Sequence, residues 1–194
     1  MVASVIDRIL GLATGARAAA ASAALAIGGT LLFRLSPYDD LKSRLDGGSL
    51  PEETLTPPGR LAEILEALGT VGRASYLQFQ LWDLLNPFLM GVAGALLLGW
   101  LLGETPRAAA SWRLVILLPL ILLVADVLEN AVIAVAIGAF PNPVALASAL
   151  RPISAVKFGA AIATMVALVL LALLRLRDRL SRRRTPPSAS GGGQ

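Results

Sequence analysis

Cysteine and histidine are both absent from this chain of 194 residues. Their absence excludes disulfides, thiol nucleophiles, imidazole bases, haem ligation by histidine and the usual ligands of zinc. Charged residues are also few, at 15% of the chain, and aromatic residues make up only 5%. Any chemistry must therefore rest on carboxylates, amines, hydroxyls and amides, and we expect neither a cofactor nor a metal centre.

Hydrophobic residues, in contrast, make up 56% of the chain, and the mean hydropathy of +0.71 exceeds that of soluble domains of this size. The sequence therefore predicts an integral membrane protein. A net charge of +4 and a pI near 10.3 would also suit a nucleic-acid-binding protein. The basic residues, however, lie beside the apolar runs, where lipid headgroups and topology account for them. We expect membrane lipid, and no nucleic acid, as a partner.

Four apolar runs are long enough to cross a bilayer, which takes about 20 residues in a helix. The predicted fold is all-α, a polytopic four-transmembrane-helix bundle with spans at residues 17–35, 76–102, 114–140 and 144–174. A cytoplasmic segment, 1–16, precedes this membrane domain, 17–174. A basic tail rich in Pro, Gly and Ser, 175–194, follows it, and we expect this tail to be disordered and cytoplasmic.

The distribution of Lys and Arg predicts the orientation, because cytoplasmic flanks carry the excess. One side of the spans carries ten basic residues: Arg8, Arg17, Arg107, Arg113, Arg175, Arg177, Arg179, Arg182, Arg183 and Arg184. The other side carries six, diluted by acids: Arg34, Lys42, Arg44, Arg60, Arg73 and Arg151. We therefore expect a multi-pass protein of the inner (plasma) membrane with both termini in the cytoplasm.

The first span also admits interpretation as a signal peptide, with Ala24-Leu25-Ala26 as an A-x-A cleavage site. Cleavage there would leave three spans and put the basic tail on the wrong side of the membrane. We therefore expect the span to be retained, with its small residues allowing a neighbouring helix to approach closely.

The outer loop, residues 36–75, contains a short amphipathic helix. Leu61, Ile64, Leu65 and Leu68 follow the spacing of one helix face, and Gly69 stands where a helix would end. Two interpretations remain open: a packed connector, or a lid over a site that opens outward.

Polar residues inside the third span are the strongest functional signal. Asp126, Glu129 and Asn130 interrupt an apolar run, and their spacing places them on one helix face. An ionised side chain near the centre of a bilayer costs several kcal/mol, from about 3 upwards, so such residues face a partner or a cavity.

Two other spans offer polar residues at a similar depth. Tyr76, Gln80, Asp83 and Asn86 form a stripe along the second span, and Lys157 lies in the fourth. At about 1.5 Å per residue, Asp83 and Lys157 lie about 10 Å from the outer ends of their spans, and Glu129 about 15 Å. We infer one shared site in the outer half of the bilayer, formed by Tyr76, Gln80, Asp83, Asn86, Asp126, Glu129, Asn130 and Lys157.

Three functions are compatible with such a site. In an intramembrane enzyme acting on a lipid-like substrate, Asp83, Asp126 and Glu129 would be the acid and base candidates, and Lys157 would stabilise developing negative charge. Small membrane isomerases of the emopamil-binding type are similar in span count and buried polarity, but no motif of theirs is present.

In a binding protein or a small proton- or cation-coupled transporter, the carboxylates would hold a small cation, and a transporter of this size would function as a homodimer. In a structural or accessory subunit, the buried charges would only fix helix packing. Three carboxylates facing one lysine leave negative charge over, which favours a ligand, lipid-like or cationic.

The polar residues also resemble a pattern found in bacterial four-span membrane proteins with an intramembrane D-x-x-E-N motif. The matching residues are Tyr38-Asp39, Gly72-Arg73, Tyr76, Asp83 to Pro87, Asp126-x-x-Glu129-Asn130 and Lys157. The family has no established activity, so the resemblance implies no chemistry. It does support treating the scattered polar residues as one constellation.

Overall fold

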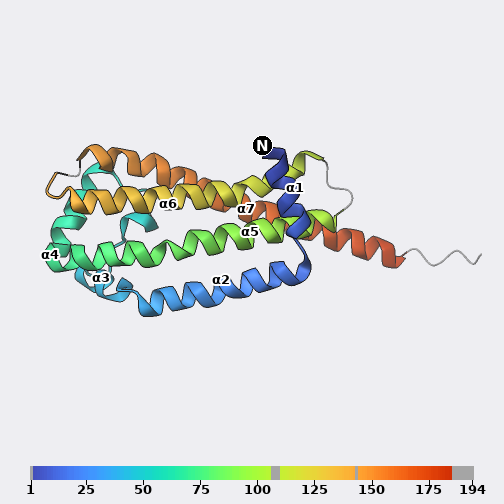
Figure 1. Cartoon of the computed structure of the whole chain (residues 1–194), viewed down its shortest axis with the longest axis horizontal. Coiled ribbons are helices and arrows are strands. Elements are labelled where there is room, and N and C mark those ends of the chain that lie inside the picture. The colour runs from blue at the N-terminus through green and yellow to red at the C-terminus, as the bar shows by residue number, and fades with distance from the viewer. Residues whose placement is uncertain (1, 106–109, 143, 185–194) are drawn as a thin grey trace, which may run out of the picture.

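The computed structural model describes residues 2–105, 110–142 and 144–184, and every regular element in them is a helix (Figure 1). The elements are α1 (Val2–Leu12), α2 (Gly15–Leu35), α3 (Tyr38–Arg44), η1 (Pro51–Glu53), α4 (Pro58–Asp83), α5 (Leu85–Gly103), η2 (Ala110–Ile116), α6 (Leu117–Gly138) and α7 (Val144–Arg184). Four helical stretches are long and apolar enough to cross a membrane, at Gly15–Leu35, Gly59–Gly103, Ser111–Gly138 and Ala147–Ser181. The prediction of an all-α, multi-pass helical bundle is confirmed.

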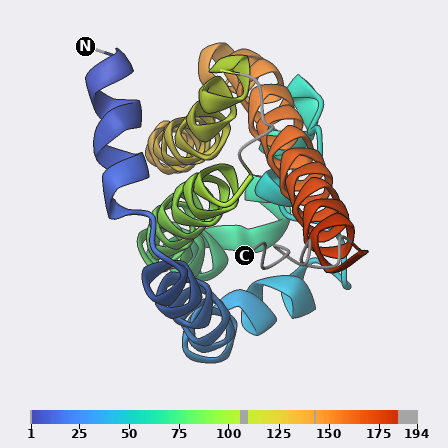
Figure 2. The same cartoon turned by 90° about the vertical axis from the view of Figure 1, so that its right-hand side faces the viewer.

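Helices α2, α5, α6 and α7 run along the long axis of the molecule with alternating direction (Figure 1). The connector between α2 and the second span, which holds α3, η1 and the part of α4 before Gly69, gathers at one end of the bundle, called here the connector end. Helices α1 and η2 lie at the opposite end, the terminal end. Seen along the bundle axis, α1 stands at the side of the other helices (Figure 2).

The amphipathic helix predicted in the outer loop is the first part of α4. Leu61, Ile64, Leu65 and Leu68 are all buried in the core cluster of the connector end, so this helix packs onto the bundle. It ends at Gly69, whose φ of 62° is a backbone conformation that other residues adopt only at a cost.

Arg73 fixes the bend that follows Gly69. Its guanidinium donates a hydrogen bond of 2.9 Å to the carbonyl of Leu65, at the end of the first part of the helix. The same guanidinium lies 4.0 Å from the centre of the Phe140 ring. The Gly72-Arg73 pair of the sequence pattern therefore shapes the connector instead of forming part of the polar site.

The second span is interrupted where the polar stripe lies. Its hydrogen-bond ladder breaks at Leu84, between α4 and α5. Pro87 lacks the N–H that would reach back four residues to the carbonyl of Asp83, which explains the break. A second proline within a span, Pro119, lies in the first turn of α6, where a missing N–H costs little.

Small residues let α5 and α6 approach closely. A Cβ atom added to Gly94 would lie 2.9 Å from the Cβ of Pro119, and one added to Gly91 would lie 2.7 Å from Leu123. Contacts this short leave no room for a side chain. The close packing holds the second and third spans, and hence their polar residues, in a fixed relation.

The terminal end differs from the sequence prediction in two places. Residues 2–12 form the helix α1, which buries Ile6 against Leu98 and Leu171 and pairs Asp7 with Arg113. The prediction that disorder begins at residue 175 was wrong for residues 175–184, which continue α7. Arg175 stabilises this extension by contacts with Trp100 and Glu104. The rest of the predicted tail, 185–194, lies outside the described residues.

Candidate functional site

A cavity of about 160 Å³ lies at the connector end, where four membrane-competent helices meet the connector. Its lining residues are Phe33, Tyr38, Glu52, Glu53, Phe79, Asp83, Asn86, Asp126 and Lys157. Phe33 is exposed and Glu53 half-buried, whereas Asp83, Asp126 and Lys157 are buried. The cavity thus leads from the surface of the connector end to charged groups inside the bundle.

Lys157 is the centre of an ion network between α6 and α7. Its ammonium pairs with Glu129, lies 3.4 Å from a carboxylate oxygen of Asp126, and donates a hydrogen bond of 2.8 Å to the backbone carbonyl of Glu52. Glu129 is fully buried and accepts a further hydrogen bond from the hydroxyl of Ser154. The spacing on each helix explains the meeting, because Asp126 and Glu129, like Ser154 and Lys157, are three residues apart.

Glu52 enters this network from the connector, as part of a strap formed by residues 50–56. The Tyr76 hydroxyl donates to its carboxylate at 2.6 Å and the Gln80 amide nitrogen at 3.5 Å. Burial raises the pKa of Glu52 to about 8, and the negative charges of Asp83 and Glu129 add to this effect against the hydrogen bond from Tyr76. Glu52 therefore holds a proton at neutral pH.

Glu53, the next residue in the strap, is held in the ionised state. Its carboxylate accepts hydrogen bonds from Tyr38 at 2.5 Å, Lys42 at 2.8 Å and the backbone N–H of Leu50 at 3.0 Å. Burial opposes ionisation, but these donors together lower the pKa of Glu53. The same hydrogen bond, with burial, raises the pKa of Tyr38 to about 12, so the phenol keeps its proton.

The carboxylate of Asp83 is hydrogen-bonded to a side-chain amide. The side-chain nitrogen of Asn130 donates a hydrogen bond of 3.1 Å to Asp83, and the structure shows no ion pair between Asp83 and any described lysine or arginine. The amide oxygens of Asn130 and Gln80 are buried, and neither has a hydrogen-bond partner among the described residues. The site is therefore rich in acceptors and short of donors.

Three aromatic rings form the apolar wall of the cavity. The ring of Tyr38 lies 4.9 Å from that of Phe33, edge to face, and 5.7 Å from that of Phe79. Lys42 lies 5.8 Å from the centre of the Tyr38 ring. Aromatic faces carry negative potential, so this wall favours positive charge as the carboxylates do.

The structure brings together all eight residues that the sequence singled out. Asp83, Asn86, Asp126 and Lys157 line the cavity. The other four lie behind it and bond to residues of the lining: Tyr76 and Gln80 to Glu52, Glu129 to Lys157, and Asn130 to Asp83.

Six residues that line the cavity or bond to Glu129 were not assigned to the site from the sequence: Phe33, Tyr38, Glu52, Glu53, Phe79 and Ser154. Ser154 precedes Lys157 by three residues, and this spacing on one helix face was a signal that would have found it. Glu52 and Glu53 stand in a connector without periodicity, where only the fold shows which way a side chain points.

The described residues contain no group of three or more acidic side chains arranged to hold a metal ion. Lys157 also occupies the position between Asp126 and Glu129 that a cation would need. The arrangement can bind a positively charged solute, store a proton on Glu52, or hold helices together, and each of these uses different residues.

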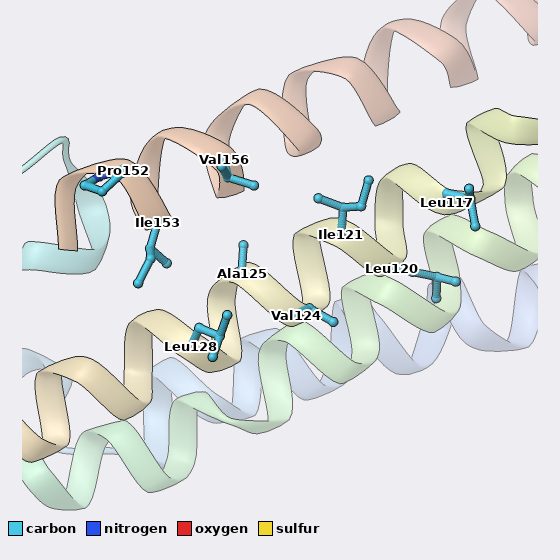
Figure 3. A pocket seen from close by; sticks show the side chains of 9 residues that line it. All are labelled: Leu117, Leu120, Ile121, Val124, Ala125, Leu128, Pro152, Ile153 and Val156. Atoms are coloured by element: carbon cyan, nitrogen blue, oxygen red, sulfur yellow. The ribbon is translucent and has the colours of Figure 1, made fainter. Parts of the chain in front are cut away.

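A second, apolar depression of about 540 Å³ lies between α6 and α7 (Figure 3). Its lining is aliphatic throughout, with Val156 and Ile153 of α7 facing Ile121, Ala125 and Leu128 of α6. Ala125 and Val156 are sequence neighbours of Asp126 and Lys157, but no described residue lines both spaces. This groove supplies no polar group for chemistry and matches the hydrocarbon of a lipid.

Comparisons with protein-family models, curated proteins and solved structures find no match to this chain. The function must therefore be argued from the site itself.

Proposed function

We propose that this multi-pass membrane protein binds a small cationic solute in the cavity at its connector end. The observation that supports this most strongly is the imbalance of charge. Besides the protonated Glu52, four carboxylates contribute to the cavity and its immediate surroundings, from Glu53, Asp83, Asp126 and Glu129, whereas only Lys42 and Lys157 among the described residues supply positive charge there.

The pairing of these groups identifies the carboxylate that would meet the ligand. Lys42 forms an ion pair with Glu53, and Lys157 forms ion pairs with Glu129 and Asp126. Glu52 is neutral when it carries its proton. Asp83 lines the cavity, is 7% exposed, and receives from the described residues only a neutral amide donor. A buried carboxylate in this position is costly unless a cation neutralises it, so we assign Asp83 as the principal ligand-binding residue.

The size of the cavity favours a small solute over a lipid-like one. Sites for drug-sized ligands occupy roughly 300–1,000 Å³, and the polar cavity has about 160 Å³. A lipid chain would fit the groove between α6 and α7 instead, and we assign that groove to bilayer lipid.

The orientation predicted from the basic residues belongs to this proposal. With both termini cytoplasmic in the inner membrane, the connector end would face outward, and the cavity would lie in the outer half of the bilayer. The solute would then enter from the outside, past Phe33 and Glu53. A coupled transporter would in addition need a path to the terminal end, and an accessory subunit would need no ligand at all.

Thermal unfolding in detergent with a panel of small cations tests the proposal. Saturable stabilisation by at least one organic cation is expected for the wild type, because a ligand that binds only the folded state raises its stability. The shift should disappear in Asp83→Asn. Asp40→Asn is the matched control, since Asp40 is an exposed acid on α3, paired with Arg44 outside the cavity.

Equal shifts in the wild type and both variants would mean that the cation binds elsewhere. Absence of any shift across the panel, with all three proteins folded, would overturn the proposal and leave the buried charges with a role in helix packing.

A further inference from the structure

We propose that the solute is a small protonated primary amine, held through its N–H groups, and not a quaternary ammonium or a metal ion. This inference rests on the proposed function, because it names the chemical class of the cation that the cavity binds. It is carried by the Asp83 carboxylate in the cavity wall, which accepts a single hydrogen bond from the described residues, and by the aromatic rings that line the same cavity.

The first step is the balance of donors and acceptors around Asp83 and Glu52. Gln80 and Asn130, each only 2% exposed, direct their amide nitrogens at these two carboxylates. Their amide oxygens are buried behind the cavity without a partner among the described residues, and Asp83, which lines the cavity, accepts only the bond from Asn130 among those residues. Buried acceptors cost free energy when no donor reaches them. A ligand that brings N–H groups to the Asp83 carboxylate relieves this cost, whereas a quaternary ammonium brings none.

The second step is the aromatic wall. The rings of Phe33, Tyr38 and Phe79 lie beside the carboxylates, with ring centres 4.9 and 5.7 Å apart along the series. A cation placed against aromatic faces gains attraction without giving up its hydrogen bonds to acceptors on its other side. A cavity lined by both carboxylates and rings suits an alkylammonium, whose charged end and short apolar stem need different surroundings.

The third step is that the protein already binds one primary ammonium in this way. Lys157 donates to a carboxylate and to the backbone carbonyl of Glu52, and its nitrogen lies 5.0 Å from the centre of the Phe158 ring. Acceptors and a ring together thus solvate an ammonium group inside this bundle. The cavity, which Lys157 also lines, repeats the same combination around Asp83, with no ammonium of the described residues paired to this carboxylate.

Titration calorimetry of the purified full-length chain tests the inference, with methylammonium and tetramethylammonium as probes. Methylammonium is expected to bind saturably and at least about tenfold more tightly, because each hydrogen bond to a charged group contributes about 1.5 kcal/mol or more. Phe33→Leu should weaken methylammonium binding about two- to fivefold through loss of the ring. Phe88→Leu is the matched control, since Phe88 is a similarly exposed phenylalanine outside the cavity.

The outcomes separate the two proposals. If tetramethylammonium binds as tightly as methylammonium, or within tenfold of it, the cation site stands and the assignment to a primary amine is overturned. If neither probe binds, the inference is overturned together with the proposal that this cavity takes small organic cations. If Phe33→Leu and Phe88→Leu weaken binding equally, the ligand does not contact the aromatic wall.

Discussion

At the scale of single residues, the charged side chains of the site form two groups. Most are paired with an oppositely charged side chain of the protein, and one has no described ionic partner. Lys157, Glu129, Ser154 and Asp126 contact one another, and all four are buried. Asp83 accepts a hydrogen bond but has no described positive partner. The first group is therefore expected to maintain the fold, and the second to bind the ligand.

Lys157→Met tests the structural role of the first group. The change leaves Glu129 and Asp126 buried without their counter-charge, and breaking one side of a buried ion pair typically costs about 3–5 kcal/mol. We expect a loss of that size in the free energy of unfolding, measured by denaturant titration in mixed micelles.

Lys42→Met is the matched control for this measurement. Lys42 and Glu53 are about one-quarter exposed, and Glu53 keeps its hydrogen bonds from Tyr38 and the backbone of Leu50. We expect a loss of about 1 kcal/mol or less. Equal effects of the two substitutions would contradict a special role for the buried network.

Sequence reasoning was most effective for residues on long helices. Asp126, Glu129 and Asn130 stand out because acids are costly in an apolar run, and helix periodicity placed them on one face. No such rule applies to Glu52, since a connector has no period from which a direction can be read. The pairing of each acid was also beyond the sequence, because it depends on rotations of the helices that only packing determines.

At the scale of elements, the strap of residues 50–56 is the least expected feature. Leu50 and Thr56 are buried, and Glu52 and Glu53 reach Tyr76, Gln80, Tyr38 and Lys42. The strap thus forms the wall of the cavity nearest to the connector. Of the two interpretations of the outer loop, a lid would require this strap to leave the bundle. The equilibrium between the docked and the undocked strap therefore distinguishes a lid from a packed connector.

The docking of the strap is expected to weaken as pH rises. Glu52 has its ordinary pKa of 4.5 when undocked and a pKa of about 8 when docked. Between pH 4.5 and about 8, the docked form therefore holds one more proton than the undocked form. The equilibrium constant for docking falls by up to about tenfold per pH unit in this range. The groups facing Glu52 are Tyr76, Gln80, Asp83, Glu129 and Lys157.

Because the chain has no native cysteine, a single introduced thiol reports on docking. Thr56→Cys places a thiol at a buried position, and Thr54→Cys places one at an exposed position. The labelling rate of the first variant is divided by that of the second. This ratio cancels the effect of pH on the ionisation of the thiol itself. This ratio should rise with pH in the wild-type background and stay constant with Glu52→Gln. A constant ratio in both backgrounds would contradict the role of Glu52.

Element boundaries show the same division between what the sequence does and does not predict. The amphipathic helix ending at Gly69 was predicted because both its apolar face and its stop signal are local. Helix α1 and the helical residues 175–184 were missed because contacts with distant segments, such as Arg175 with Trp100, help to stabilise them.

At the scale of the whole molecule, the close packing of α5 against α6 and the polar cavity lie in different parts of the bundle. Gly91 and Gly94 bring α5 against Pro119 and Leu123 in the first two turns of α6, while the cavity opens where the connector covers the ends of the helices. The number of spans and their alternation follow from hydropathy alone. The cavity does not, because it arises where the connector fails to fill the space between four helices.

Whether the unpaired charge of Asp83 serves a ligand or the fold is best decided by the free energy of unfolding of Asp83→Asn without any added cation. The substitution keeps the shape and still accepts the hydrogen bond from Asn130, but removes a buried charge that has no described counter-ion. We expect Asp83→Asn to be as stable as the wild type or more stable by about 1 kcal/mol, since charges kept for binding are often costly to the fold. A loss of several kcal/mol would show that Asp83 holds the bundle together and would contradict its assignment as the ligand-binding carboxylate.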